Sequence, residues 1–358
     1  MSRYIALDAF RGLTIALMIL VNTPGSWDFV YWPLMHANWH GVTPTDLVFP
    51  FFLFIIGSAM FFSFRKTSFA LTPQQLIRVI KRGGIIFLLG LFLNAYPFVT
   101  PLENLRVMGV LQRIGIAYIL ASCVVLLCSK RQIWTFCSVL LVGYWLLLLT
   151  VPNAPFSLES NLVRSFDLAI LGAGHMWQVG DLAFDPEGLL STLPSVVSVL
   201  LGFEITRMIT AIDNKKDCVI KLIKVAGALL FVSLLWQLIL PLNKQLWTSS
   251  YVIFSTAMAC LLLALFVYLI DIRKGEQRLA SLLVYGTNPL FIYVFSWLWT
   301  TTYLHISVGE IDLYQWLFNI LALVFEPYLA SLIFALAHVI LFWLVSLWLY
   351  QRRIFVKI

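Results

Sequence analysis

The sequence predicts an all-α, polytopic integral membrane protein of about ten transmembrane helices plus one short or re-entrant helix, with both termini in the cytoplasm. Of its 358 residues, 61% are hydrophobic and 11% are charged, whereas soluble domains are about 45–50% apolar and about 25% charged. The mean hydropathy is +0.92. The 15% aromatic content is typical of proteins with aromatic belts at the membrane interfaces. A chain of this composition buries its apolar surface in a bilayer.

Ten apolar runs approach the roughly 20 residues that a helix needs to cross the hydrocarbon core. A further run, 313–325, is shorter and ends at Glu326-Pro327, so we expect a half-helix or re-entrant piece whose ends are buried by protein. The ten predicted spans are residues 8–23, 46–64, 83–99, 108–128, 132–151, 188–208, 220–240, 250–270, 281–303 and 329–350.

The basic residues orient these spans. With the N-terminus in the cytoplasm, all but four of the 24 Lys and Arg residues fall on the cytoplasmic side, as the positive-inside rule requires. An eleventh crossing at 313–325 would move Arg352-Arg353 outside, so the charge bias favours ten. Because the basic residues are spread over short loops, the net charge of +7 does not indicate a nucleic-acid partner.

The organisation of the chain favours one transmembrane domain over residues 1–358, without a soluble domain or a clear internal repeat. The first apolar run resembles a signal peptide but lacks a small-x-small cleavage site, so we expect a retained helix. The compact length and the lack of an organelle-targeting feature favour a bacterial cytoplasmic (inner) membrane, with the long loops in the periplasm.

Polar chemistry is densest in the segment 22–57, on the external side of the predicted membrane. A histidine just outside the hydrocarbon, His36, has Asn22 and Asp46 in the same segment, which suits a general base with a partner that fixes its tautomer. Asp46 also follows Thr43-Pro44-Thr45 at the start of a span, where a carboxylate caps a helix. His36 is equally compatible with an ordinary interfacial histidine. Both interpretations stay open on residue type alone.

A second group contains Arg106 and Arg113, seven residues apart. This spacing predicts that both point along one face of the fourth span. A charge inside the membrane needs a protein partner, so Arg113 either forms a buried ion pair with a carboxylate such as Glu159 or Asp8, or belongs to an anion site. Arg11, in the first span, allows the same two interpretations.

A third group lies in the long external segment 151–187 and the start of the following helix. Its repeated acids beside Trp177 and Asn161 are typical of a carbohydrate-binding face, which needs hydrogen-bonding groups and a ring for stacking. The alternative is a wet loop in which Asp185-Pro186-Glu187 caps the sixth span. Asn288-Pro289 breaks the ninth span and frees backbone groups within the membrane.

Several of these segments together resemble one family, the heparan-α-glucosaminide N-acetyltransferases and their bacterial relatives. The resemblance runs in order from about residue 5 to the C-terminus, and the motif from His36 to Gly57 is its most specific part. The strings that carry it are Leu7-Asp-Ala-Phe-Arg-Gly12, Val21-Asn22, His36-x-x-Trp-x-Gly-x-Thr-x-x-Asp46-Leu-Val-Phe-Pro50, Arg106-x-x-Gly-Val-Leu-Gln-Arg113, Asp185-Pro-Glu-Gly188 and Asn243-Lys-x-Leu-Trp-Thr-Ser249.

The resemblance implies transmembrane acetylation, in which the acetyl group of cytoplasmic acetyl-CoA passes to a glucosamine-type amine across the membrane. The catalytic histidine of the family matches His36 and its paired asparagine matches Asn22; we expect Asp46 to orient His36. The phosphates of CoA favour cationic and amide groups, and we expect no metal. The candidates for donor binding are Arg11, Gln112, Arg113 and Asn288, and those for acceptor binding are Trp39, Glu159, His175, Asp185, Glu187 and Lys244.

Two other functions remain open. One is an amino-sugar transporter of the inner membrane, because some bacterial relatives are regarded as N-acetylglucosamine-related transporters and the ninth span is broken. The other is an O-acetyltransferase that modifies a cell-envelope glycan with the same donor. The expected partners are acetyl-CoA, an amino sugar or glycan acceptor and the lipid bilayer. A homodimer stays open, and we expect no nucleic-acid partner.

Overall fold

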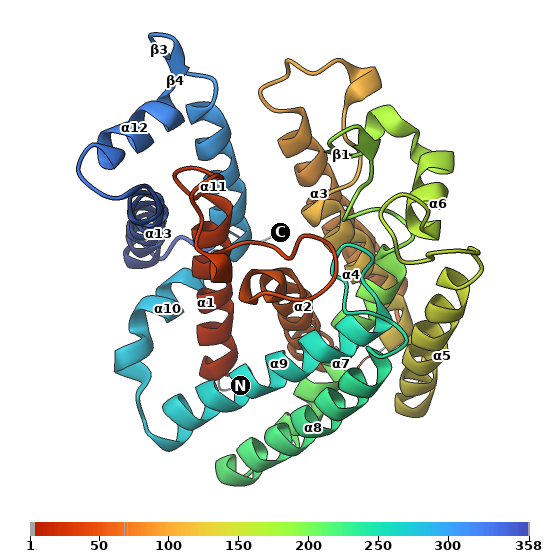
Figure 1. Cartoon of the computed structure of the whole chain (residues 1–358). Helices are drawn as coiled ribbons and strands as arrows, with labels where there is room; N and C mark the ends of the chain where they lie inside the picture. Colours follow the sequence, from red (N-terminus) through yellow and green to blue (C-terminus); the bar gives the residue numbers. More distant parts are fainter. Residues whose placement is uncertain (1–3, 68, 70, 357–358) are drawn as a thin grey trace. The chain divides into compact units, whose positions relative to one another are not determined.

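The computed structural model describes residues 4–67, 69 and 71–356, and these residues are mostly helical (Figure 1). The chain forms two compact units. The first unit comprises Met1–Ala37, Thr43–Val48 and Phe266–Ile358, and the second comprises Asn38–Val42 and Phe49–Leu265. The single domain expected over residues 1–358 stays a prediction.

The first unit is built around α1 (Ile5–Asn22), which packs against α10, α11 and α13. Two antiparallel two-residue strands form a hairpin before α12. The other elements of this unit are η1 (Trp32–Leu34), η2 (Pro44–Leu47), the π-helical turn η5 (Tyr268–Ile272), η6 (Glu276–Leu279), α10 (Ala280–Tyr285), α11 (Pro289–Tyr303), β3 (Ser307–Val308), β4 (Ile311–Asp312), α12 (Leu313–Ala322) and α13 (Pro327–Gln351).

The second unit contains the remaining long helices, with α4 between α3 and α7 and with α5 and α8 also packed on α7. A second small hairpin lies between α6 and α7. The elements of this unit are α2 (Val48–Arg65), α3 (Pro73–Ala95), η3 (Leu102–Asn104), α4 (Val110–Leu127), α5 (Lys130–Leu148), α6 (Leu162–Leu171), η4 (Ala173–His175), β1 (Gln178–Val179), β2 (Leu182–Ala183), α7 (Thr192–Thr210), α8 (Lys215–Trp236) and α9 (Ser249–Val267).

Eight helices in the described part of the chain are long and apolar enough to cross a membrane, or nine if the bent pair around Asn288-Pro289 is one span. The two helices of that pair meet at 59°, so the predicted break is present where proline removes a backbone donor. The predicted run 313–325 is the ten-residue helix α12. The helix α3 starts ten residues before the predicted span at 83, because Thr72 caps it and Pro73 begins it. The count of ten spans and the placement of both termini in the cytoplasm stay predictions.

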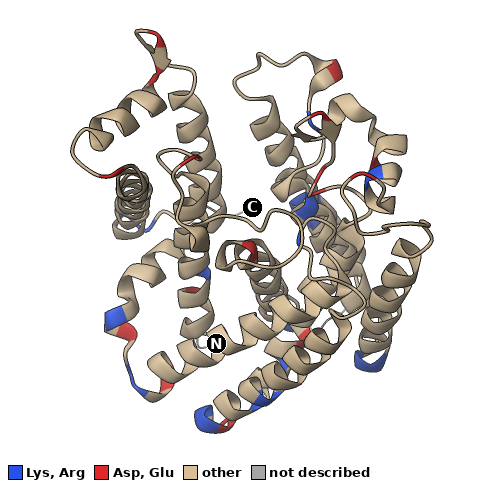
Figure 2. Cartoon of the chain, viewed as in Figure 1, with Lys and Arg blue, Asp and Glu red and all other residues tan. Residues whose placement is uncertain are grey.

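Charged residues in the second unit are separated along its helices. Figure 2 shows Lys and Arg at the starts of α5 and α8, and acids in the segment between α6 and α7 near the opposite ends of these helices. This segment is long because it contains η4 and the β1–β2 hairpin. The polar groups that the sequence singled out there are therefore in an ordered part of the chain.

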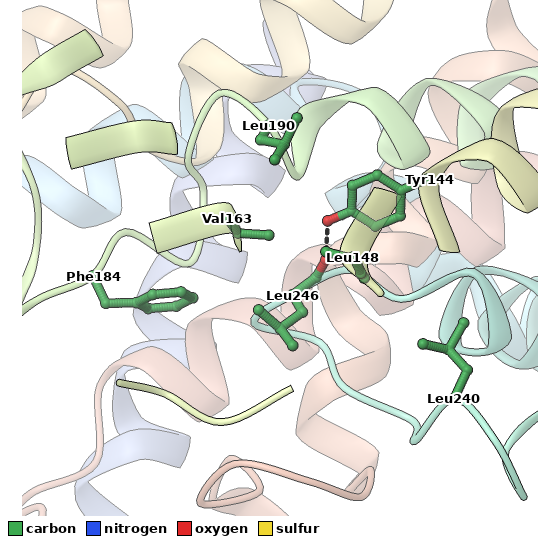
Figure 3. Close-up of a cluster of buried hydrophobic side chains, with 7 residues drawn as sticks. All are labelled: Tyr144, Leu148, Val163, Phe184, Leu190, Leu240 and Leu246. Atoms are coloured by element: carbon green, nitrogen blue, oxygen red, sulfur yellow. Dashed lines mark hydrogen bonds between the residues drawn. The ribbon is translucent and has the colours of Figure 1, made fainter. Parts of the chain in front are cut away.

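A cluster of buried apolar side chains underlies this segment. Phe184 and Leu190 come from the segment before α7, Val163 from α6, and Tyr144 donates a hydrogen bond from its hydroxyl to the carbonyl oxygen of Leu246 at 2.6 Å (Figure 3). The ring of Trp39 packs on the same cluster. Burial of this apolar surface fixes the loops that carry the polar groups.

Candidate functional site

His36 and Asp46, both in the first unit, form a hydrogen-bonded pair. The Nδ1 atom of His36 lies 2.7 Å from Oδ1 of Asp46. The imidazole side chain is 42% exposed, whereas the carboxylate is 2% exposed. A buried acceptor therefore holds a solvent-accessible ring.

The carboxylate of Asp46 is fixed by a second set of contacts through Oδ2. The backbone N–H groups of Ala37 and Thr43 each donate to this oxygen at 3.0 Å. The hydroxyl of Thr43 lies 3.0 Å from the same oxygen and 2.6 Å from the carbonyl oxygen of Met35. Thr43 and Asp46 also form a capping box at the start of η2. Oδ2 of Asp46 thus takes part in the capping box, while Oδ1 is bonded to His36.

This geometry selects one tautomer of His36. A carboxylate accepts a hydrogen bond, so Nδ1 carries the proton and the basic lone pair of a neutral ring is on Nε2. The same carboxylate stabilises the imidazolium that forms when Nε2 accepts a proton. The pair has the chemistry of a general base with an orienting partner.

Asn22 is the last residue of α1 and is exposed. Its side chain makes no hydrogen bond to another described residue, so the structure does not itself pair it with His36. Its neighbours Val21 and Pro24 line a small apolar pocket together with Tyr31 and Leu34, which precede His36. The chain segments that carry Asn22 and His36 thus border the same pocket.

The residues that follow His36 along the chain are anchored in the second unit by Asn243, which is buried. Its Nδ2 donates to the carbonyl oxygen of Trp39 at 2.8 Å and lies 3.2 Å from Nδ1 of His40. Its Oδ1 accepts from the N–H of Leu246 at 2.7 Å, and Gly41 forms a β-bridge with it. The indole N–H of Trp39 donates to Phe156 at 2.6 Å. Partial burial lowers the pKa of His40.

Arg106 lies in an ion-pair network with two of the predicted acceptor-binding acids. Its Nε and Nη2 donate to the two oxygens of Asp185 at 2.8 and 2.7 Å, and Nη2 also donates to Glu187 at 2.7 Å. Asp185 is completely buried. Burial by itself lowers the pKa of Arg106, but the paired Asp185 and Glu187 outweigh it and raise the pKa overall. Asp185 therefore holds Arg106 in place.

The prediction that Arg106 and Arg113 share a helix face is wrong. The helix α4 begins only at Val110, and Gly109 before it is fully extended. The side chain of Asn94 donates to the carbonyl oxygens of Arg106 and Met108 at 2.9 and 3.1 Å. Because these oxygens are already bonded to Asn94, the segment that contains them is not helical. Arg106 lies outside the helix and Arg113 inside it.

Arg113 is completely buried and its partners are neutral. Its Nη2 donates to the hydroxyl of Ser191 and, at 3.3 Å, to the carbonyl oxygen of Gly188. Its guanidinium lies 4.9 Å from the ring centroid of Trp247, a cation–π distance. The alternative of an ion pair with a carboxylate such as Glu159 or Asp8 is wrong, because no carboxylate of the described residues is within ion-pair distance of Arg113, and Asp8 pairs with Arg11. Two of its nitrogen atoms, Nε and Nη1, have no hydrogen-bond partner among the residues that the structure describes.

The other candidates for donor binding have structural contacts. Arg11 donates to Asp8 at 3.1 Å and to the carbonyl oxygen of Gly286 at 3.3 Å. Gln112 donates to the carbonyl oxygen of Val107 at 3.0 Å. Asn288 is buried and holds the C-terminal segment, since its amide donates to Ile354 at 2.9 Å and accepts from Val356 at 2.8 Å.

The remaining candidates for acceptor binding are more exposed. The Nδ1 atom of His175 lies 2.7 Å from the carbonyl oxygen of Leu105. The carbonyl oxygen of Glu159 accepts from Arg164 at 3.1 Å, and its side chain is exposed. Lys244 is partly buried beside Asn243. Within residues 4–67, 69 and 71–356, no three His, Cys, Asp or Glu side chains are grouped as metal ligands.

Residues 3–216 match the family described as "Heparan-alpha-glucosaminide N-acetyltransferase, catalytic". The chain belongs to this family. The match includes the His36–Asp46 pair, Arg106, Arg113 and the Asp185–Gly188 segment.

Two curated relatives have the same family name. The heparan-alpha-glucosaminide N-acetyltransferase of Homo sapiens is 29% identical over 352 residues, covering 81% of this chain and 52% of the human protein. That of Mus musculus is 26% identical over 355 residues, covering 82% of this chain and 53% of the mouse protein. The chain thus spans about half the length of these relatives.

For two residues that build the site region, the structural role could not be predicted from the sequence. The sequence shows Asn243 only as part of a string that carries the family resemblance, although an Asn beside Lys244 in an apolar chain is a signal for a structural hydrogen-bonding role. Arg106 was placed on the wrong element, and its partners 79 and 81 residues away have no signal in local sequence.

Proposed function

We propose that the chain is a membrane-embedded acyltransferase that transfers the acetyl group of acetyl-CoA to the amine of an amino sugar, with His36 as the general base. The observation that carries the proposal is the hydrogen bond between His36 and the buried carboxylate of Asp46. Membership of a family named for N-acetyl transfer supports the reaction class.

In the proposed reaction, the neutral amine attacks the carbonyl carbon of the thioester, so a C–N bond forms and the C–S bond breaks. Nε2 of His36 takes the proton that the amine loses, and Asp46 stabilises the resulting imidazolium. The proton then returns to the departing sulfur, which leaves as the thiol of CoA. The exposed amide of Asn22 donates to the oxygen that gains negative charge.

We place the donor on the cytoplasmic side of an inner membrane, because the predicted topology gathers the Lys and Arg residues there and CoA carries phosphates. The amino sugar approaches from the opposite side. Direct transfer is favoured over an acetyl-histidine, since it needs one reactive intermediate fewer. The apolar pocket between the segments of Asn22 and His36 suits the methyl group of the acetyl donor.

The test uses the purified full-length chain in lipid nanodiscs with radiolabelled acetyl-CoA and glucosamine. The wild type transfers label to the sugar. His36→Ala lowers kcat by about 10²- to 10⁴-fold, the usual contribution of a general base. His305→Ala is the matched control, because His305 is also exposed in the first unit and its Nδ1 contacts only a local carbonyl at 2.8 Å; it keeps wild-type activity.

Other outcomes decide between the competing functions. Label that hydroxylamine releases from the product indicates an ester and therefore an O-acetyltransferase, because amides resist this treatment. Uptake of unmodified glucosamine into proteoliposomes, without label transfer and insensitive to His36→Ala, indicates a transporter. Equal activity of His36→Ala and wild type contradicts the proposal.

A further inference from the structure

A small apolar pocket lies inside the first unit, where the end of α1 and the start of α13 meet the segment that precedes His36. The helix α1 contributes Val21 to its lining, and α13 contributes Leu332 and Ala335. Leu34 of η1 lines it from the side of the histidine. All of these residues belong to the same compact unit as His36.

Hydrogen bonds hold the backbone around this pocket in place. The N–H of Gly25 donates to the carbonyl oxygen of Ser331 at 3.2 Å, and the N–H of Ser26 donates to the hydroxyl of Ser331 at 3.2 Å. The segment after α1 is therefore attached to α13. On the side of η1, the hydroxyl of Thr45 donates to the carbonyl oxygen of Pro33 at 3.1 Å. The pocket is thus pre-organised, which lowers the entropic cost of binding a ligand in it.

The lining of the pocket suits a short hydrocarbon group. None of the described residues that line it is charged. The hydroxyl of Ser331 is already used, because it accepts from the N–H of Ser26 and donates to the carbonyl oxygen of the same residue, both at 3.2 Å. A sugar ring or a phosphate would lose its hydrogen bonds to water there without gaining others, whereas a methyl or ethyl group has none to lose.

Both residues proposed for the chemistry lie next to this lining along the chain. Val21 directly precedes Asn22, and Leu34 lies two residues before His36. Because consecutive Cα atoms are about 3.8 Å apart, the Cα atom of His36 is no more than about 7.6 Å from that of Leu34. A thioester whose carbonyl group is at Asn22 and His36 can therefore place its hydrocarbon end in the pocket.

We propose that this pocket binds the acyl group of the donor and that Ala335 limits the length of the acyl chain. This rests on the proposed function and deepens it by naming a residue that determines donor specificity. Ala335 is 2% exposed and has the smallest side chain of the lining residues. A larger side chain at this position fills the space that an additional methylene of the acyl chain needs, and a smaller one enlarges that space.

The test compares Ala335→Val and Ala335→Gly with wild type, using acetyl-CoA or propionyl-CoA as donor and glucosamine as acceptor. One methylene in an apolar pocket changes kcat/KM by about 10- to 200-fold. Ala335→Val therefore raises the ratio of kcat/KM for acetyl-CoA to that for propionyl-CoA by at least about tenfold, and Ala335→Gly lowers this ratio. Because both donors are measured on one preparation, the ratio does not depend on the fraction of protein that is folded.

The matched control is Ala337→Val. Ala337 lies on the same helix, is exposed and does not line the pocket, so the same change there keeps the wild-type donor ratio. Equal ratios for Ala335→Val and Ala337→Val overturn the proposal.

A binding measurement separates this proposal from the proposed function. Isothermal titration calorimetry on the full-length chain in nanodiscs, without a sugar, compares acetyl-CoA with CoA. Wild type binds acetyl-CoA more tightly, and Ala335→Val loses this preference. If these binding results are obtained but wild type transfers no acetyl group, the proposed function fails and the acyl pocket stands. If wild type binds acetyl-CoA no more tightly than CoA, the acyl pocket is overturned, whether or not acetyl transfer occurs.

Discussion

Asp46 uses its two oxygens for different purposes, one for the ring of His36 and one for the backbone that carries it. A single buried carboxylate therefore sets the tautomer of the histidine and the path of the loop around it. Because the oxygens are chemically equal, replacing one of them with an NH2 group separates the two tasks.

We predict that Asp46→Asn lowers kcat about a hundredfold, within the range of general-base contributions, while the protein stays folded. The amide oxygen still accepts from Ala37 and Thr43, but the NH2 group now faces Nδ1 of His36. A donor at that position moves the ring proton to Nε2 and removes the basic lone pair from it. Acetyl-transfer kinetics and a thermal unfolding curve measure the two effects. A variant that unfolds far below wild type, or keeps full kcat, contradicts this assignment.

Asp167 in α6 is a second buried carboxylate, but it is incompletely satisfied. Its Oδ1 accepts from the N–H groups of Leu189 and Leu190 at 3.0 and 3.2 Å, whereas Oδ2 has no hydrogen-bond partner within the described part of the chain. A Cβ at Gly188 would lie 1.7 Å from Oδ2, so only glycine leaves room for it. Burial raises the pKa of Asp167 from 3.8 to about 6.

We predict that this carboxyl makes stability depend on pH. Between pH 3.8 and about 6 the folded state binds the proton more tightly than the unfolded state. The stabilisation is therefore complete at the lower pH and is lost as pH rises through 6. Two pKa units correspond to roughly 3 kcal/mol. Thermal unfolding from about pH 4 to about pH 7 should show that Asp167→Asn gains stability relative to wild type as pH rises; parallel curves for the two proteins would disprove the linkage.

At the scale of elements, α2 and α7 of the second unit approach each other closely through two glycines. A Cβ at Gly57 would lie 1.9 Å from the carbonyl oxygen of Val199, and one at Gly202 would lie 2.1 Å from that of Phe54. Ser58 and Thr206 hydrogen-bond across the same contact at 2.8 Å. Small residues that let backbones meet, with hydroxyls between them, are how helices associate in lipid.

We predict that Gly57→Ala destabilises the protein by about 1–3 kcal/mol, the usual cost of overpacking. Gly143→Ala in α5 is the control, because a Cβ there has nothing within 4 Å and alanine favours a helix over glycine by about 0.5–1 kcal/mol. The unfolding temperature in one detergent should fall for the first variant and hold or rise for the second. Equal shifts would mean that the α2–α7 approach is looser than its geometry indicates.

At the scale of the whole molecule, the number of membrane crossings decides which compartments the proposed donor and the proposed acceptor reach. Among the residues described, eight helices qualify by length and hydropathy. The helix α3 and the bent pair around Asn288-Pro289 bring the number to ten if both cross. One of them alone gives nine and puts the two termini on opposite sides.

We predict an even number of crossings, with both termini in the cytoplasm. Green fluorescent protein fused after Ile358 should fluoresce in a bacterial host, and alkaline phosphatase at the same position should be inactive. The positive-inside distribution of Lys and Arg is the physical reason. An active phosphatase fusion would remove one crossing from the predicted ten and would place the basic C-terminal residues with the acceptor.

Local sequence was sufficient for the helices and for part of the site. Apolar runs of membrane length gave the main helices, the Asn288-Pro289 pair gave the bend of 59°, and the spacing of ten residues between His36 and Asp46 was short enough to suggest their contact. Local sequence did not predict that Arg106 lies outside the helix that contains Arg113. The start of that helix at Val110 depends on Asn94, which lies on the preceding helix α3. Residue type alone does not show that a distant side chain occupies a carbonyl oxygen.

The sequence by itself determined that this is an integral membrane protein, which of its segments form helices and to which family it belongs. Hydropathy, capping and motif spacing are local properties of the chain, so they can be read without the fold. Only the tertiary structure decided which hydrogen-bond and ion-pair partners the polar side chains have. Asn243 holds Trp39 from 204 residues away, and Asp185 and Glu187 hold Arg106 beside Trp177. A buried polar group must be satisfied by whatever group packing brings to it, and that choice is made by the fold rather than by neighbours in sequence.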